Sequence, residues 1–233
     1  MTNLVHYTTE DNYAIITINN GKANALSNEV ITDITAALDK AKSENRVVIL
    51  TGQPGIFSGG FDLNIMKKGP KSAKTLVTAG SKLALKMSSF PLPIISACNG
   101  HAIAKGAFLL LASDYRIGAE GAFKIGLNEV MIGMTMHHVG IAIAKHKLAP
   151  VYFERAVNNA EIFPSADAVT AGFLDAVVPE DQVLPAAIKA AKLFGQLNLK
   201  AHAATKLRVR KNYLKTLEKA IKKDKSSKIA INA

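Results

Sequence analysis

Two glycine-rich turns are the features of this chain that could carry out chemistry. An apolar run at residues 47–52 leads to the turn at 57–62, and a second run at 93–100 leads to the turn at 104–106. A strand that enters a tight turn and then a helix leaves unpaired backbone N–H groups pointing outward. Two such turns facing one pocket would supply two donors to one developing oxyanion, a large contribution in carbonyl chemistry. The doubled turn makes an enzyme the leading hypothesis.

The segments that must position these turns alternate between predicted strands and predicted helices. Ser27 is a good N-cap, and apolar residues then recur at helical spacing from Val30 to Ala41. The alternation predicts an α/β core with crossover connections, followed by a helical C-terminal third. Strands are predicted at 5–8, 13–19, 47–51, 94–98, 114–119 and 174–178. Further helices are predicted near 76–87, 107–112, 139–147, 151–158, 165–171, 183–197 and 202–223.

Length and composition place the chain in the class of folded globular proteins. The 233 residues are 48% hydrophobic, which is ample for one large domain with a buried core. No apolar run reaches membrane-span length, and the first residues lack the pattern of a signal peptide. The single cysteine, Cys98, has apolar neighbours and is predicted to lie in the core. We therefore expect a cytoplasmic protein with no membrane partner.

The net charge of +11 is concentrated near the C-terminus. Eleven Lys and Arg residues against two acidic ones, Glu218 and Asp224, give residues 199–228 a net charge of +9. Such a helix could bind an anionic ligand, a phosphate-bearing group or RNA, or it could be a solvated face. Tyr213 is its only aromatic residue, which argues against stacking on single-stranded RNA, so no nucleic-acid partner is expected.

Both glycine-rich turns resemble signatures of one family. Residues 49–63 resemble the first signature of the crotonase superfamily, the enoyl-CoA hydratase/isomerase group, and residues 93–102 resemble the second. Further matches occur in order at 24–27, 114–117, 126–130 and 166–178. The resemblance implies a crotonase-like spiral of ββα units over residues 1–180. It also implies a C-terminal helical trimerisation region over 181–233, in a homotrimer or a dimer of trimers.

The family acts on acyl-CoA thioesters and stabilises an enolate or a tetrahedral oxyanion. By position, the resemblance implies the backbone N–H groups of Phe61 and Lys105 as the two oxyanion donors. It also implies that the acyl chain lies along 63–66 and 76–83, and that the Lys105 side chain points away from it. Coenzyme A would be part of the substrate, so no separate cofactor is expected. Glycines would let the chain turn tightly around the thioester, and further residues would contact CoA; together these are Gly59, Gly60 and Gly106, with Lys22, Ala23 and Ala25.

The candidate acid/base group is Glu129. Hydratases of the family use two glutamates to activate a water, and the later one matches Glu129. The earlier position holds Phe108, which cannot transfer protons but would still line the substrate site. One carboxylate is enough to move a proton from C2 to C4 of a 3-enoyl thioester, so Δ3–Δ2-enoyl-CoA isomerisation is favoured. Burial beside Phe108 should raise the pKa of Glu129 toward neutrality.

Several alternatives stay open at this point. A 2-enoyl-CoA hydratase could work with Glu129 alone or with help from His137 or His138. A non-catalytic acyl-CoA-binding protein could retain the two turns that bind the thioester without catalysing a reaction. The adjacent histidines lack the i, i+4 partner of a helical metal site, so no metal is expected. Asp62 is predicted to be a helix cap rather than a catalytic group.

Overall fold

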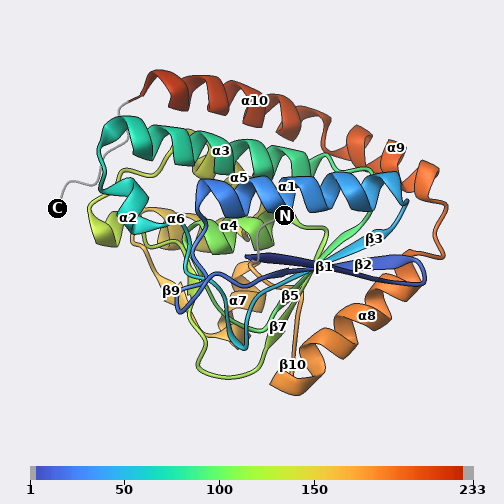
Figure 1. The fold of residues 1–233 in the computed structure, drawn as a ribbon. Helices are drawn as coiled ribbons and strands as arrows, with labels where there is room; N and C mark the ends of the chain where they lie inside the picture. The colour runs from blue at the N-terminus through green and yellow to red at the C-terminus, as the bar shows by residue number, and fades with distance from the viewer. Residues whose placement is uncertain (1–3, 228–233) are drawn as a thin grey trace.

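Two β-sheets and the helices around them build the protein in the computed structural model, which describes residues 4–227 (Figure 1). The larger sheet has six strands in the order β1-β2-β3-β5-β7-β10, and the smaller has four in the order β4-β6-β8-β9. The larger sheet consists of β1 (Val5–Glu10), β2 (Tyr13–Ile18), β3 (Val47–Thr51), β5 (Ile94–Cys98), β7 (Tyr115–Ala119) and β10 (Ala176–Val178). The smaller consists of β4 (Gly55–Ser58), β6 (Gly100–Ile103), β8 (Ile125–Gly126) and β9 (Ile162–Phe163).

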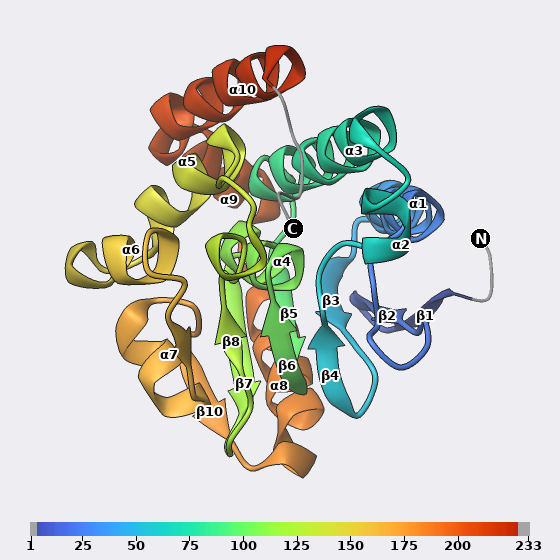
Figure 2. The ribbon, with the colours of Figure 1, turned by 90° about the vertical axis from the view of Figure 1, so that its left-hand side faces the viewer.

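The two sheets grow together along the chain. Strands β3, β5 and β7 of the larger sheet are followed by β4, β6 and β8 of the smaller one, and a helix then returns to the next repeat (Figure 2). Neighbouring strands within each of these two sets are parallel. The repeat confirms the predicted spiral of ββα units, although the structure describes one chain and does not show a trimer.

Side-chain caps mark the starts of the first two helices. Ser27 accepts a hydrogen bond from the backbone N–H of Val30 and begins the first helix, as predicted. Asp62 caps the second in the same way, accepting from the N–H of Asn64 at 2.8 Å, which confirms its structural role. The helices are α1 (Asn28–Ser43), α2 (Leu63–Met66), α3 (Pro70–Ser88), α4 (Lys105–Ala112), α5 (His138–Lys147), α6 (Pro150–Val157), α7 (Ser165–Ala171), α8 (Val183–Phe194), α9 (Leu199–Val209) and α10 (Lys211–Ser226). Short 3-10 turns lie at Val130–Ile132 and Glu180–Gln182.

Strands β3 and β5 of the larger sheet are buried on both faces, as their apolar sequences predict. Helices α1 and α4 contact the sheet on one face and α8 contacts it on the other, while α3 packs over α1 and α4 (Figure 1). In β3 the side chains alternate: Val48 and Leu50 belong to the core on the α1 side, while Val47 and Ile49 pack with residues of α8. Cys98 is fully buried, as predicted.

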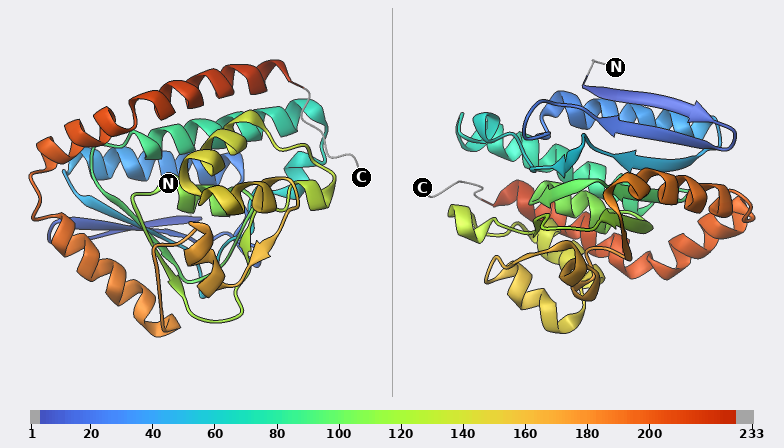
Figure 3. Two further views of the ribbon diagram at one scale, coloured as in Figure 1. Left: turned by 180° about the vertical axis from the view of Figure 1, so that it is seen from behind. Right: turned by 90° about the horizontal axis from the view of Figure 1, so that it is seen from below.

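The C-terminal helices pack back onto this core. Helix α10 runs along α3 and α5, as the view from behind shows (Figure 3), and its buried Tyr213 stacks on His146. The prediction of a single helix over 202–223 is wrong, because the chain breaks at Arg210 between α9 and α10. The predicted division at residue 180 stays a prediction. None of the described helices is long and apolar enough to cross a bilayer.

Part of the basic segment serves the fold. The Lys206 ammonium donates to the Asp114 carboxylate at 2.6 Å and to the carbonyls of Phe90 and Leu92. Arg210 lies 2.9 Å from the other oxygen of Asp114. These two cations are therefore structural, which reduces the set available to bind an anion. Lys228, which was counted in the segment, lies outside the described residues.

Candidate active site

The carboxyl ends of three parallel strands bring the candidate residues together. Strands β4, β6 and β8 lie side by side and run in the same direction, so their carboxyl ends meet at one edge of the smaller sheet. Phe61 comes three residues after β4, Lys105 two residues after β6, and Glu129 three residues after β8. The topology thus places three segments that are far apart in the sequence around one point.

The backbone of Phe61 is held by a short bridge to the segment before α1. Leu26 and Phe61 form a parallel β-bridge, in which Leu26 donates to the carbonyl of Gly60 and accepts from the N–H of Asp62. In this pattern the N–H of Phe61 itself points away from Leu26. Within the described part of the chain that N–H donates to no acceptor, so it remains free for a ligand.

The backbone of Lys105 is aimed by a strained neighbour. Ala104 has φ 51° and ψ −120°, a conformation that non-glycine residues rarely adopt, and it directly precedes α4. Gly60 has φ 97°, and a Cβ added there would lie 3.2 Å from the Lys105 nitrogen and 3.0 Å from the Ala104 Cβ. The two turns are therefore in close contact, and a residue without a side chain is needed at position 60 for this approach. Among residues 4–227 the Lys105 N–H also has no acceptor.

A narrow cavity of about 70 Å³ lies beside these turns. Of the predicted site residues, Gly59, Phe61 and Glu129 line it, whereas Gly60, Gly106 and Phe108 do not. Gly106 instead packs so closely on the backbone of Ser58 that a side chain there would collide with its carbonyl. The walls also contain Leu63, Met66 and Val77, which belong to the predicted acyl region, and the candidate His137. The sequence did not assign a role to the remaining wall residues, Ala104, Asn128, Ile132 and Met134.

Glu129 is an almost fully buried carboxylic acid on this cavity wall. Its exposed fraction is 6%, and its Oε2 has no hydrogen-bond partner among the described residues. Burial raises the pKa of Glu129 to about 7, while its own backbone N–H and the positive charge of Lys105 act in the opposite direction. A carboxyl group with this pKa can accept and return a proton near neutral pH.

The side chain of Lys105 lies inside the protein next to this cavity. It is 1% exposed, its Nζ lies 5.9 Å from the ring centres of both Phe61 and Phe108, and its Cε packs against Gly80 of α3. Lys105 does not line the cavity. Its side chain fills the space that Gly80 leaves on α3, at a position where another side chain would collide with it. The expectation that it points away from the acyl chain stays a prediction.

His137 is the other titratable group on the wall. Its ring meets Phe108 edge to face, with centroids 5.5 Å apart, and its Nε2 is buried without a hydrogen-bond partner in residues 4–227. Burial, and then the positive charge of Lys105, lower the pKa of His137 to about 3. The imidazole is therefore neutral at physiological pH. Phe108 is fully buried behind it rather than on the cavity wall.

The segment predicted to contact CoA lies against the first turn. Ala23 accepts a hydrogen bond from the Gly59 N–H at 2.9 Å, and the buried Asn24 side chain ties the segment to the carbonyls of Ile18 and Phe57. Lys22 and Ala23 are exposed and Ala25 is half-buried. This backbone is thus rigidly attached beside the cavity and open to solvent.

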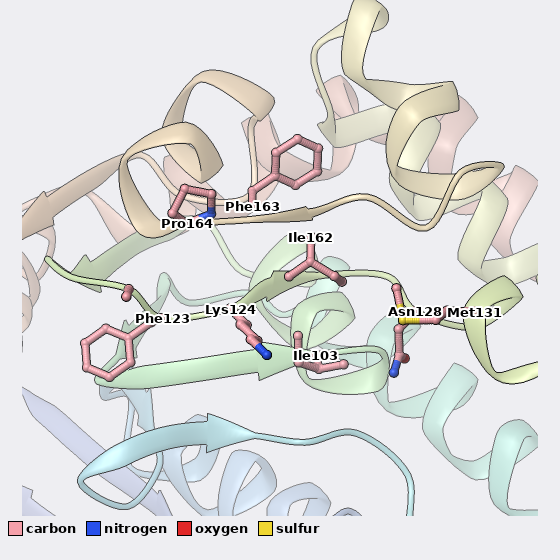
Figure 4. A pocket seen from close by; sticks show the side chains of 9 residues that line it. Ile103, Phe123, Lys124, Asn128, Met131, Ile162, Phe163 and Pro164 are labelled. Atoms are coloured by element: carbon pink, nitrogen blue, oxygen red, sulfur yellow. The ribbon is translucent and has the colours of Figure 1, made fainter.

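A larger hollow of about 570 Å³ lies on the other side of Asn128, which lines both spaces. In Figure 4, Phe123 lies at one end of this hollow and Asn128 and Met131 lie at the other. Its walls are mainly apolar, with Lys124 as the one charged residue among those described. Groups of three or more His, Cys, Asp or Glu side chains placed to hold a metal ion do not occur in residues 4–227.

Comparisons with known proteins all identify the same family. A family model described as enoyl-CoA hydratase/isomerase matches residues 8–230. An enoyl-CoA hydratase/isomerase family protein from Pseudomonas syringae is 52% identical, with a TM-score of 0.96 over 97% of this chain and 99% of that one. An enoyl-CoA hydratase from Mycobacterium marinum is 36% identical, with a TM-score of 0.92 over 96% and 99% of the two chains.

Another relative is named after the isomerisation of a double bond. Enoyl-CoA delta isomerase 1, mitochondrial, from Rattus norvegicus is 35% identical over 189 residues, which is 77% of this chain. The chain spans 64% of that relative's length. Similar proteins are thus named after both double-bond isomerisation and hydration.

Proposed function

This chain belongs to the enoyl-CoA hydratase/isomerase family, and on that premise we propose that it converts a 3-enoyl-CoA thioester into the 2-enoyl isomer. This proposal rests mainly on which residues line the cavity. Glu129 is the one carboxylate among the described residues that line it, and Phe108 stands behind the wall where a second acid was expected. One acid/base group suits the movement of a proton within the substrate better than the addition of water.

The proposed reaction uses the two free amides and the carboxylate in turn. The thioester oxygen accepts hydrogen bonds from the N–H groups of Phe61 and Lys105. The Glu129 carboxylate removes a proton from C2, and the electron pair delocalises over the thioester and the neighbouring double bond as a dienolate. The protonated Glu129 then returns the proton to C4, which leaves the double bond between C2 and C3. No electron is gained or lost, so the proposed step needs no cofactor besides the CoA of the substrate.

The environment of Glu129 supports this cycle. Its pKa of about 7 lets the group exist as carboxylate before proton removal and as acid afterwards, without a large cost in either direction. The apolar walls supplied by Leu63, Met66 and Val77 surround the space next to it with aliphatic carbon. An unbranched apolar acyl chain is the substrate that such a space favours.

CoA would enter past the exposed segment at Lys22, Ala23 and Ala25, since this backbone adjoins Gly59 at the cavity. Its phosphates would need cations from the C-terminal helices. Lys206 and Arg210 are paired with Asp114, so the exposed lysines of α10 are better placed to supply them. Nucleic acid is not part of this proposal.

Hydration of a 2-enoyl thioester is the second candidate function. The position of His137 on the cavity wall favours it. A neutral imidazole with an unpartnered Nε2 on the cavity wall could orient a water molecule beside Glu129. The Mycobacterium marinum relative is named a hydratase. A non-catalytic acyl-CoA-binding protein is less well supported, because a buried carboxylate without a partner has a high cost in a site with no use for it.

We also propose that the protein assembles as a trimer or a dimer of trimers. Large apolar side chains lie exposed on α8, α9 and the turn between them, namely Leu193, Leu197, Leu207 and Val209. Contact with other copies would cover them. The expected cytoplasmic location remains a proposal, since the rat relative is named mitochondrial.

The catalytic assignment is tested with Glu129→Gln and 3-hexenoyl-CoA. The amide keeps the size of the side chain but cannot accept the proton, so kcat should fall by about 10²–10⁴-fold. Binding of hexanoyl-CoA, measured by calorimetry, should persist in the variant. Unchanged turnover in Glu129→Gln would remove Glu129 from the mechanism.

A further inference from the structure

Three titratable groups gather in one apolar cluster at the cavity, and the proposed reaction uses only one of them. The atoms are Lys105 Nζ, Glu129 Oε2 and His137 Nε2, each buried without a hydrogen-bond partner among the described residues. Two phenyl rings link the groups. Phe108 lies next to both Lys105 and His137, and Phe61 lies next to Lys105 and lines the same cavity as Glu129 and His137. A lysine amine with no partner in such surroundings calls for an explanation.

Burial of an ammonium group without compensation is costly, and an apolar side chain would fill the same space at no such cost. Lys105 lies against Gly80, Phe61 and Phe108, none of which can accept a hydrogen bond through its side chain. The stem of a methionine would pack there equally well. Packing alone therefore does not explain a lysine at this position. The explanation that remains is its positive charge.

We propose that Lys105 is a positioning residue whose buried ammonium group favours the basic, charged form of Glu129 in the empty site. This inference rests on the proposed function, because it concerns the readiness of Glu129 to remove a proton. The same residue then serves the site twice, with its backbone N–H at the thioester oxygen and its ammonium group acting on the base.

Electrostatics within the cluster support this pairing. Lys105 and Glu129 are each other's only charged influence among the described residues, and each favours the ionised form of the other. Burial lowers the pKa of Lys105 to about 7 and raises the pKa of Glu129 to about 7.

The surrounding elements add few other charges. From α5, His137 faces the cluster and is neutral, while the exposed His138 acts on His137. From α10, Asp224 accepts hydrogen bonds from the N–H groups of His138 and Val139 and is thereby occupied. Asp62, next to Phe61, is bonded to the start of α2. The coupling between Lys105 and Glu129 is therefore the main charge interaction in the cluster.

Lys105→Met removes the charge and keeps both the backbone N–H and the length of the side chain. Lys82→Met is its matched control, since it removes one positive charge from the exposed face of α3. The titration of Glu129 is followed by NMR in the ligand-free protein labelled with ¹³C at its glutamate carboxyl carbons. The Glu129 signal is assigned by its absence in Glu129→Gln. Thermal unfolding confirms that each variant is folded, and Lys105→Gln serves as a second neutral variant.

Loss of a nearby positive charge makes a carboxylate harder to form, so Lys105→Met should raise the Glu129 midpoint by about one pH unit or more. Lys82→Met should leave it within about 0.2 unit, because an exposed charge is screened. The acidic limb of kcat/KM for 3-hexenoyl-CoA should move with the NMR midpoint. A midpoint in Lys105→Met equal to that of the wild type would overturn the inference.

The two readouts separate this inference from the proposed function. A shifted NMR midpoint in a protein that does not turn over 3-hexenoyl-CoA would leave the Lys105–Glu129 pairing intact and reject the isomerase. Isomerase activity with an unshifted midpoint in both neutral variants would support the isomerase and reject the Lys105–Glu129 pairing.

Discussion

The ring of Phe108 lies edge to face against the imidazole of His137, with 5.5 Å between their centroids. This contact occupies the place where the family resemblance led us to expect a second carboxylate. The phenyl ring packs against His137 on the cavity wall, and helix α4, where the second acid was expected, contains no carboxylate. Glu129 is left as the acid/base group of the proposed reaction, and the predictions below follow from that arrangement.

The proposed isomerase activity should depend on pH through Glu129. Because its pKa is about 7, the carboxyl is protonated below that pH and cannot accept a proton from C2. We expect kcat/KM for 3-hexenoyl-CoA to rise about tenfold per pH unit in the acidic range and to level off above pH ~7. A pH–rate profile measures this directly. A profile that is flat from pH 5 to 8 would show that Glu129 does not limit the reaction through its ionisation.

His137→Gln should distinguish the two candidate reactions. If Glu129 alone transfers the proton, the variant should keep 3-hexenoyl-CoA turnover within about tenfold of the wild type, since a neutral polar group remains at the wall. If His137 orients a water molecule for hydration, turnover of crotonyl-CoA should fall by about 10²-fold or more. Initial rates with both thioesters measure these effects.

Gly60→Ala should damage the proposed oxyanion site while leaving the protein folded. The new Cβ would lie 3.0 Å from both the Ala104 Cβ and the Ile103 carbonyl and would displace the Lys105 N–H. Loss of one aligned donor costs about 10²-fold in kcat. The matched control is Gly55→Ala, at φ 77° with no atom within 4 Å, which imposes the same kind of backbone strain away from the site. Equal kcat values for the two variants would argue against the assigned donor.

Asp114→Ala should be strongly destabilising. Asp114 is mostly buried between Lys206 and Arg210, so its removal leaves two cations without their anion, at a cost of about 3–5 kcal/mol. Asp39→Ala breaks an exposed pair with Lys86 of the same 2.6 Å length and should cost less than about 1 kcal/mol. Urea unfolding of both variants gives the comparison. A cost for Asp114→Ala as small as for Asp39→Ala would show that the network contributes little.

The central strands of the larger sheet could be predicted from the sequence because β3 and β5 are fully buried runs of five mainly apolar residues. The Ile94–Cys98 strand and the Ser165–Ala171 helix have the predicted bounds. The smaller sheet was missed, since β8 and β9 have only two residues each and β4 and β6 only four, too few to show a period. Yet the carboxyl ends of these short strands are what bring the site together.

The break at Arg210 and the path of the Lys105 side chain also escaped prediction, for a common reason. Residues 198–226 contain no proline or glycine, and the bend coincides with Lys206 and Arg210 reaching Asp114 on a distant loop. Lys105 turns inward because Gly80 of α3 makes room for it. Both features depend on contacts between residues far apart in the sequence, which local patterns do not encode.

The most direct test of the account compares 3-hexenoyl-CoA and crotonyl-CoA as substrates of the wild-type protein under identical conditions. Isomerisation by the single Glu129 predicts that 3-hexenoyl-CoA is converted to 2-hexenoyl-CoA, while water is added to crotonyl-CoA at least about 10²-fold more slowly. Rapid hydration of crotonyl-CoA with no conversion of 3-hexenoyl-CoA would contradict the account.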